Sequence, residues 1–184
     1  MTTPEIPRPT SGDVVDLILD DHRLFEALLR ELRDATADRE AAREALSHVL
    51  IAHGEAEEEK VYTTLNSKRA ITKHEAEHGE EEHAEGNEAL LALLECKGTD
   101  TQKFDDAVEE LAKALNHHIG EEEQTILNPA RTEVSEDVRQ ELGVAWATRR
   151  NQLLEEGAGS ITNVRAIVAR AHREGLLPAD DEEE

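Results

Sequence analysis

Two segments of the sequence place a histidine one helical turn before a glutamate. They are HGEAEEEKVY, which contains His53 and Glu57, and HIGEEEQTIL, which contains His118 and Glu122. In an α-helix, residues four apart lie on the same face, so each pair presents an imidazole and a carboxylate together. This combination suits divalent transition metals, because imidazole nitrogen and carboxylate oxygen are both ligands of such ions. Either pair alone is a weak indication, and a metal centre requires further donors from other helices.

Both pairs interrupt a row of apolar residues that would otherwise face a core. One such row, spaced by three or four residues, consists of Phe104, Val108, Leu111, Leu115, His118, Glu122 and Ile126. His22 interrupts a similar row near the N-terminus, and His83 interrupts another in the middle of the chain. Burying an unpartnered carboxylate is strongly unfavourable, so these rows must either turn to the surface or meet a cation.

The elements that carry these residues are predicted to be helices. Aromatic residues make up only 2% of the chain, and Ala, Leu and Glu are abundant, which favours helices over strands. Thr72 and Glu75 form a predicted capping box, and Asn128 with Pro129 is expected to end a helix. Apolar periodicity and these signals predict helices over about 13–34, 38–66, 72–97, 103–128, 135–156 and 160–173.

We therefore predict an all-α fold, an antiparallel up-down four-helix bundle with two additional C-terminal helices. The predicted parts are an extended N-terminal arm at 1–12, the bundle at 13–130, a C-terminal helical extension at 131–175 and an acidic disordered tail at 176–184. Antiparallel helices joined by short loops return along the distance they travelled, at about 1.5 Å per residue. Counting from the loops places four histidines at nearly one depth, namely His22, His53, His83 and His118.

Four imidazoles and two carboxylates at one depth suit iron, zinc, manganese or cobalt, whereas the lack of a thiolate argues against softer ions. If Glu57 and Glu122 each bridge, the six residues fit a pair of metal ions better than a single ion. Such a pair would keep room for an oxo or hydroxo bridge and for an exchangeable ligand.

These segments resemble bacterial hemerythrin-like proteins, the HHE cation-binding family. The resemblance rests on DDHRLFEALL, HGEAEEEKVY, EEHAEGNEALLALL and HHIGEEEQTILNPA and covers about residues 13–130. It implies a non-haem di-iron centre in which histidines are terminal ligands and two glutamates bridge. The residues that match the family pattern are His22, His53, Glu57, His83, His118 and Glu122.

Gly79 is a departure from the oxygen-carrying members, which have a further histidine one turn before the third-helix ligand. The missing side chain predicts open approach of a small diatomic or peroxide ligand to one metal ion. The expected function is redox handling of small oxidants, either catalase-like disproportionation of hydrogen peroxide or detoxification of nitric oxide. The alternative is a module that senses oxygen, iron or redox state, or binds oxygen without turnover.

The third helix leaves the ligand choice open. His78 could replace His83 if the preceding helix is longer, and Glu80 could join it. Tyr62 falls opposite His53 on a regular helix, so it is interpreted as packing, with a role at the metals only if that helix is irregular. The neighbouring acidic residues are expected to form a solvated face, namely Glu58, Glu59, Glu121 and Glu123. A zinc site and a metal-free acidic bundle remain alternatives.

The formal charge of -23 argues against nucleic acid and anionic membranes as partners, because both recruit basic clusters. Cys96 is the single cysteine, so an intramolecular disulfide is excluded and a reducing cytoplasm is expected. The sequence leaves the identity of any protein partner open.

Overall fold

A computed structural model describes residues 4–178 of the chain. The secondary-structure elements of this part are all helical, which confirms the predicted fold class. Residues 1–3 of the predicted arm and 179–184 of the predicted tail lie outside the described residues. In chain order, the elements are α1 (Val14–Arg33), α2 (Arg39–Ala56), η1 (Glu57–Tyr62), α3 (Thr63–Ser67), α4 (Lys73–Leu94), α5 (Gln102–Glu122), η2 (Glu123–Leu127), α6 (Asn128–Glu133), α7 (Glu136–Glu155) and α8 (Ile161–Arg173).

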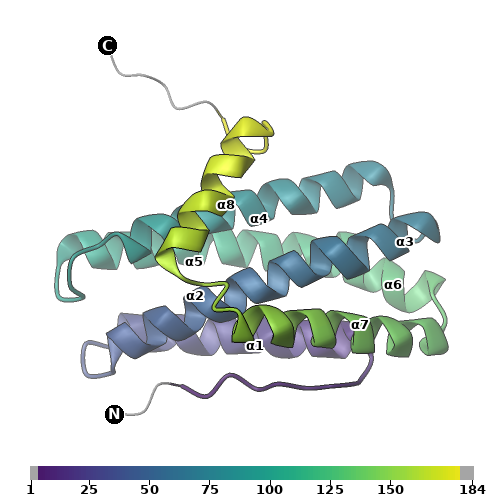
Figure 1. Cartoon of the computed structure of the whole chain (residues 1–184), viewed down its shortest axis with the longest axis horizontal. Coiled ribbons are helices and arrows are strands. Elements are labelled where there is room, and N and C mark those ends of the chain that lie inside the picture. The colour runs from purple at the N-terminus through teal and green to yellow at the C-terminus, as the bar shows by residue number, and fades with distance from the viewer. Residues whose placement is uncertain (1–3, 179–184) are drawn as a thin grey trace.

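Four long rods form the bundle (Figure 1). They are α1, the continuous run α2–η1–α3, α4, and the continuous run α5–η2–α6, with α1 against α2 and α4 against α5. The two C-terminal helices pack on the outside of this bundle. Helix α7 contacts α1 and α2, whereas α8 crosses α4.

Side-chain caps fix where the helices begin. The Thr72 side chain accepts from the Glu75 backbone N–H, and the Glu75 carboxylate accepts from the Thr72 backbone, so the predicted capping box is present. Asp13, Thr101 and Ser135 cap α1, α5 and α7 in the same position. Each cap satisfies a backbone donor that the first helical turn leaves free.

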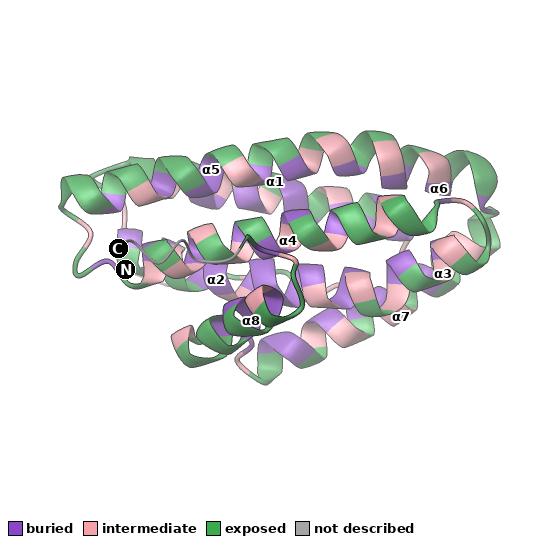
Figure 2. Ribbon diagram, turned by 90° about the horizontal axis from the view of Figure 1, so that it is seen from above, coloured by how far each residue is buried: buried purple, intermediate pink, exposed green. Residues whose placement is uncertain are grey.

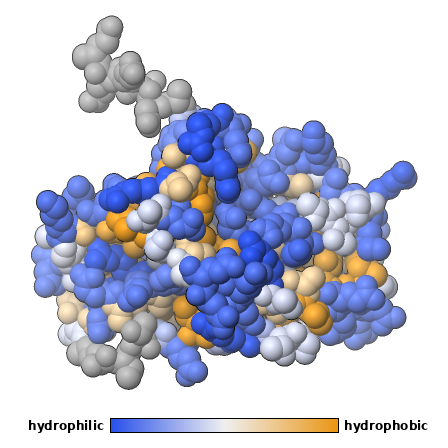
Figure 3. Space-filling model, in the orientation of Figure 1, coloured by the Kyte–Doolittle hydropathy of each residue, from blue (hydrophilic) through white to orange (hydrophobic). Residues whose placement is uncertain are grey.

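The buried residues lie between the rods, and the outer faces of the helices are exposed (Figure 2). Phe25, Leu46, Leu90 and Trp146 are among the large side chains that are fully buried. The face seen in Figure 3 is mostly hydrophilic, with apolar patches between the helices. Among the described helices, none combines the length and the apolar character needed to cross a bilayer.

Two of the predicted helices are irregular. A π-helical segment, η1 or η2, interrupts each of them at the glutamate of the His–Glu pair or just after it. The fourth predicted helix does not end at Asn128, and α6 continues to Glu133. Pro129 lies in the first turn of α6, directly after η2, which is the part of a helix that best tolerates the missing N–H of proline. Isolated π-turns in helices frequently mark functional sites.

Candidate metal centre

The structure brings all six predicted residues together in the bundle interior. The first rod supplies His22, the second supplies His53 and Glu57, α4 supplies His83, and α5 supplies both His118 and Glu122. Each lies on the inner side of its helix because it occupies a position of the apolar row. Their exposure is low throughout, and Glu57 is completely buried.

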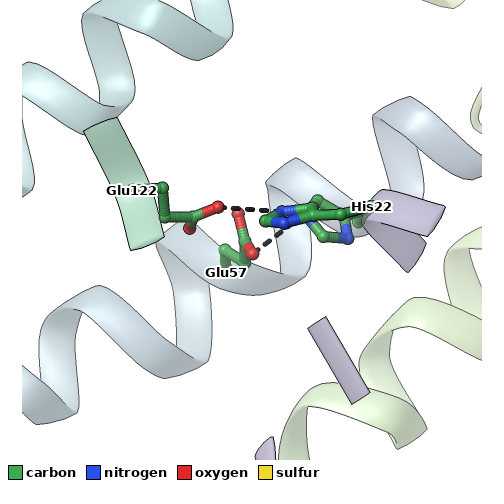
Figure 4. Close-up of side chains that lie close together, drawn as sticks. His22, Glu57 and Glu122 are labelled. Atoms are coloured by element: carbon green, nitrogen blue, oxygen red, sulfur yellow. Dashed lines mark ion pairs between the residues drawn. The ribbon is translucent and has the colours of Figure 1, made fainter. Parts of the chain in front are cut away.

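The donor atoms form two overlapping groups. One group contains His22, His53, Glu57 and Glu122, and the other contains Glu57, His83, His118 and Glu122. Within each group the ligand atoms lie within 4.8 Å of one another. Both carboxylates belong to both groups, and Figure 4 shows the Glu122 carboxylate paired with the His22 imidazole, with Glu57 beside them.

Each of the two carboxylates faces two imidazole Nε2 atoms. The Nε2–oxygen distances to Glu57 are 2.9 Å for His53 and 3.1 Å for His83, and those to Glu122 are 3.1 Å for His22 and 3.4 Å for His118. Several of these buried atoms make no hydrogen bond, namely Nε2 of His22, His53 and His118, both oxygens of Glu57, and Oε2 of Glu122. Buried polar atoms are rarely left unsatisfied. Inward-facing nitrogen and oxygen donors of this kind fit a bound transition metal.

In three histidines the Nδ1 atom, which faces away from the donor groups, is hydrogen-bonded to a second carboxylate. The Nδ1–oxygen distances are 3.0 Å from His53 to Asp21, 2.8 Å from His83 to Glu58 and 2.9 Å from His118 to Glu82. A carboxylate at Nδ1 fixes the proton there and turns the Nε2 lone pair inward, as ligating histidines require. The prediction that Glu58 belongs to a solvated face is therefore wrong, because its carboxylate is bound to His83.

The sequence interpretation did not identify these supporting carboxylates, although a signal existed. Asp21 directly precedes His22, Glu58 directly follows Glu57, and Glu82 directly precedes His83. Each is a chain neighbour of one candidate ligand and supports a histidine on an adjacent rod. Only the relative placement of the rods shows this pairing.

Charges in the centre shift the pKa values of its groups. Burial alone would lower the pKa of His53, but Glu57 and Asp21 outweigh burial and raise it to about 10. Burial also opposes protonation of His83, and its carboxylate partners raise its pKa well above the usual value. Burial would raise the pKa of Glu122, yet the adjacent histidines hold it well below its usual value. Metal binding must therefore displace protons from imidazoles.

Tyr62 points into the centre, so its interpretation as simple packing is wrong. Its hydroxyl donates to Glu122 Oε1 at 2.9 Å and lies 3.4 Å from His83 Nε2. Its ring stacks on His83 with centroids 5.6 Å apart. The reason is η1, because its wider π-turn rotates the residues that follow Glu57 relative to a regular α-helix.

Gly79 does not leave an open channel as predicted, because the Tyr62 ring occupies that place. A Cβ atom at Gly79 would lie 2.8 Å from Tyr62 Cε2 and 3.1 Å from its hydroxyl oxygen. The alternative third-helix ligands also lie outside the two donor groups. His78 is directed at Glu82 with a side chain that is 45% exposed, and Glu80 belongs to neither group.

A pocket beside the centre offers a different approach for a small molecule. It lies between all four rods, and three of the candidate ligands line it. Its lining includes Phe25, His53, Gly54, Glu58, His83, Asn87, Leu115 and His118. Gly54 adds no side chain to this pocket. A Cβ atom at this position would lie 3.5 Å from His83 Nδ1, in contact with the imidazole.

Helix α7 and the N-terminal arm support the centre from outside the bundle. The buried Arg150 guanidinium donates from Nε and Nη2 to the two Asp21 oxygens, each at 2.7 Å. It also donates to the Pro7 carbonyl at 2.9 Å. The Trp146 ring meets His53 edge-on, with centroids 5.5 Å apart. One helical extension thus positions His53 both by packing and through Asp21.

Comparison with known proteins returned one family. The model of the hemerythrin HHE cation binding domain matches residues 13–129, which include all six candidate ligands. The searches of curated proteins and of solved structures returned no match.

Proposed function

Because the chain belongs to the hemerythrin HHE cation-binding family, we propose that its centre holds two non-haem iron ions and turns over small oxidants. The favoured substrates are hydrogen peroxide, which would be disproportionated to water and oxygen, and nitric oxide. The observation that carries the proposal is the pair of four-donor groups that share Glu57 and Glu122. Carboxylates that belong to both groups fit two neighbouring metal ions with an oxo or hydroxo bridge better than two separate single-ion sites.

Iron would supply the reversible electron transfer that turnover of an oxidant needs, while the protein residues supply position and charge. His22, His53, His83 and His118 are the proposed terminal ligands, and the two glutamates are the proposed bridging ligands. The second carboxylates at Nδ1 hold three of these imidazoles in one tautomer. Disproportionation of peroxide requires no external reductant, which suits a buried centre.

Tyr62 and the pocket beside the centre both favour the proposal that the substrate is a small molecule. Burial raises the pKa of the Tyr62 phenol well above 10.0, and the negative charge of Glu122 adds to this. The phenol therefore keeps its proton at neutral pH and can donate a hydrogen bond from Oη beside the donor groups. The narrow pocket beside the centre, lined by apolar Phe25 and Leu115 and by three of the candidate histidine ligands, suits a molecule as small as peroxide or nitric oxide.

A sensing role without turnover is the second candidate, and one contact favours it. Asp21 joins His53 in the centre to Arg150 on α7, and Arg150 reaches the N-terminal arm at Pro7. A change in ligand state at His53 would thus reach the outer surface through buried hydrogen bonds.

Elemental analysis with an absorption spectrum tests the proposal. We expect about two iron ions per chain and an oxo-to-ferric band in the near ultraviolet and visible for the wild-type protein. Glu57→Gln should lose both. Glu59→Gln is the matched control, because Glu59 lies in the same π-turn but pairs with Arg149 at the surface. A protein with one ion or none, or a band unchanged in Glu57→Gln, would contradict the di-iron assignment.

Turnover is tested separately on iron-loaded protein. Rapid consumption of hydrogen peroxide or nitric oxide that is lost in Glu57→Gln and kept in Glu59→Gln would support the enzymatic role. A stable, reversible oxygen complex with no consumption of either oxidant would support the sensing or oxygen-binding alternative.

A further inference from the structure

A second group of histidines and glutamates lies beside the centre, on the outer side of α4 and α5. His78 and Glu82 are one turn apart on α4, and His117 and Glu121 are one turn apart on α5. These helices run side by side (Figure 2). We call these four residues the outer cluster. Two His–Glu pairs on facing helices repeat the arrangement of the inner centre at the surface.

The geometry of the outer cluster is compact. Ligand atoms of His78, Glu82 and Glu121 all lie within 4.8 Å of one another. His117 Nε2 lies 3.4 Å from Glu82 Oε1. Two imidazoles and two carboxylates can therefore be brought to a single ion by small side-chain rotations, because both imidazoles stand at the rim of the cluster.

Glu82 gives an independent indication of a missing ligand. Its side chain is only 5% exposed, and Oε2 is bound to His118 Nδ1 at 2.9 Å. The other oxygen, Oε1, is buried and accepts no hydrogen bond. This oxygen faces His78 Nε2 at 3.3 Å and His117 Nε2 at 3.4 Å. A buried carboxylate oxygen without a partner requires an explanation, and a cation between it and the two imidazoles provides one.

The alternative is a pair of ordinary surface ion pairs. Such pairs contribute little, because solvent screens exposed charges. That account suits His172 and Glu88, which lie 3.4 Å apart with both side chains partly exposed. It does not suit Glu82, whose free oxygen is withdrawn from water. The His78 and His117 side chains are 45% and 60% exposed, so an ion can reach the cluster directly from solution.

We propose that the outer cluster binds one divalent transition-metal ion, of the class of zinc or ferrous iron. The donors are imidazole nitrogen of His78 and His117 and carboxylate oxygen of Glu82 and Glu121, a set that suits these ions. The formal charge of -23 favours capture of cations. Glu82 links the outer ion to the inner centre, since its second oxygen holds His118.

Zinc binding by the whole protein tests this site. Protein with its native metal content is dialysed against Zn²⁺, and zinc and iron are counted by elemental analysis. We expect the wild type to retain one zinc ion per chain in addition to its native metals. The double variant His78→Ala/Glu121→Gln should lose this ion while keeping the absorption spectrum of the inner centre. His172→Ala is the control and should retain the ion, because it removes a partly exposed histidine that lies outside the outer cluster and has one carboxylate partner, Glu88.

Two outcomes would overturn the proposal: the wild type retains no additional zinc, or the double variant retains as much as the wild type. A second readout is the NMR signal of each histidine ring, because Co²⁺ at the cluster should shift or broaden His78 and His117 but leave His172 unchanged. Glu57→Gln separates this proposal from the di-iron one. The variant should lose the inner metals and still bind the outer ion.

Discussion

Replacing Arg150 by methionine tests how α7 supports the metal centre. The guanidinium donates two hydrogen bonds of 2.7 Å to Asp21, and the side chains are only 1% and 7% exposed. Methionine keeps much of the apolar stem but removes the charge, which leaves Asp21 buried with His53 as its remaining charged partner. Breaking a buried pair from one side costs about 3–5 kcal/mol. For a domain of this size, this lowers the melting temperature by roughly 6–20 °C.

Chemical and thermal unfolding, followed by circular dichroism, measure this change in the metal-free protein. Arg149→Met is the matched control. The neighbouring Arg149 pairs with Glu59 at the surface, and loss of an exposed pair changes the free energy of unfolding by less than about 1 kcal/mol. The double variant Asp21→Asn/Arg150→Met removes both charges, so it should cost less than the sum of the two single variants.

The reasoning is refuted if Arg150→Met is as stable as Arg149→Met, or if the Asp21 and Arg150 changes are additive. In the first case the buried pair would contribute no more than a surface pair. In the second case the two side chains would act independently despite their contact.

Three further results are expected. Tyr62→Phe removes the hydroxyl that donates to buried Glu122. The free energy of unfolding of the metal-free protein, measured in urea, should fall by about 1.5–3 kcal/mol. A smaller loss would indicate that water replaces the phenol. Gly79→Ala places a Cβ atom 2.8 Å from the Tyr62 ring. The overpacking should cost about 1–3 kcal/mol of unfolding free energy and outweigh the gain of about 1 kcal/mol in helix propensity. A variant more stable than the wild type would show that the ring moves aside easily. The raised pKa of His53, about 10 against 6.5, stabilises the metal-free fold fully below about pH 6.5 and less as the pH approaches 10. Metal binding at pH 7 should therefore release protons, measured by calorimetry in buffers of different ionisation enthalpy, and equal heats in all buffers would contradict this shift.

The sequence determined the fold class and placed the candidate ligands on the inner faces of the helices. Apolar rows with a period near 3.6 residues define one face of each helix, and His22, His53 and His118 occupy positions in those rows. Short loops between antiparallel helices set the relative heights, so the convergence of these residues followed from counting. The choice of His83 over His78 depended on the same count, and the structure places His83 with the inner donors.

Tertiary structure decided the features that depend on contacts between rods. Tyr62 enters the centre because η1 departs from α-helical geometry, and a count at a regular 3.6 residues per turn sends it to the opposite face. The pairing of Asp21, Glu58 and Glu82 with histidines on other rods depends on helix rotation and spacing, which periodicity within one helix does not fix. The Arg150–Asp21 contact joins residues far apart in the chain, and packing of α7 against α1 and α2 brings them together.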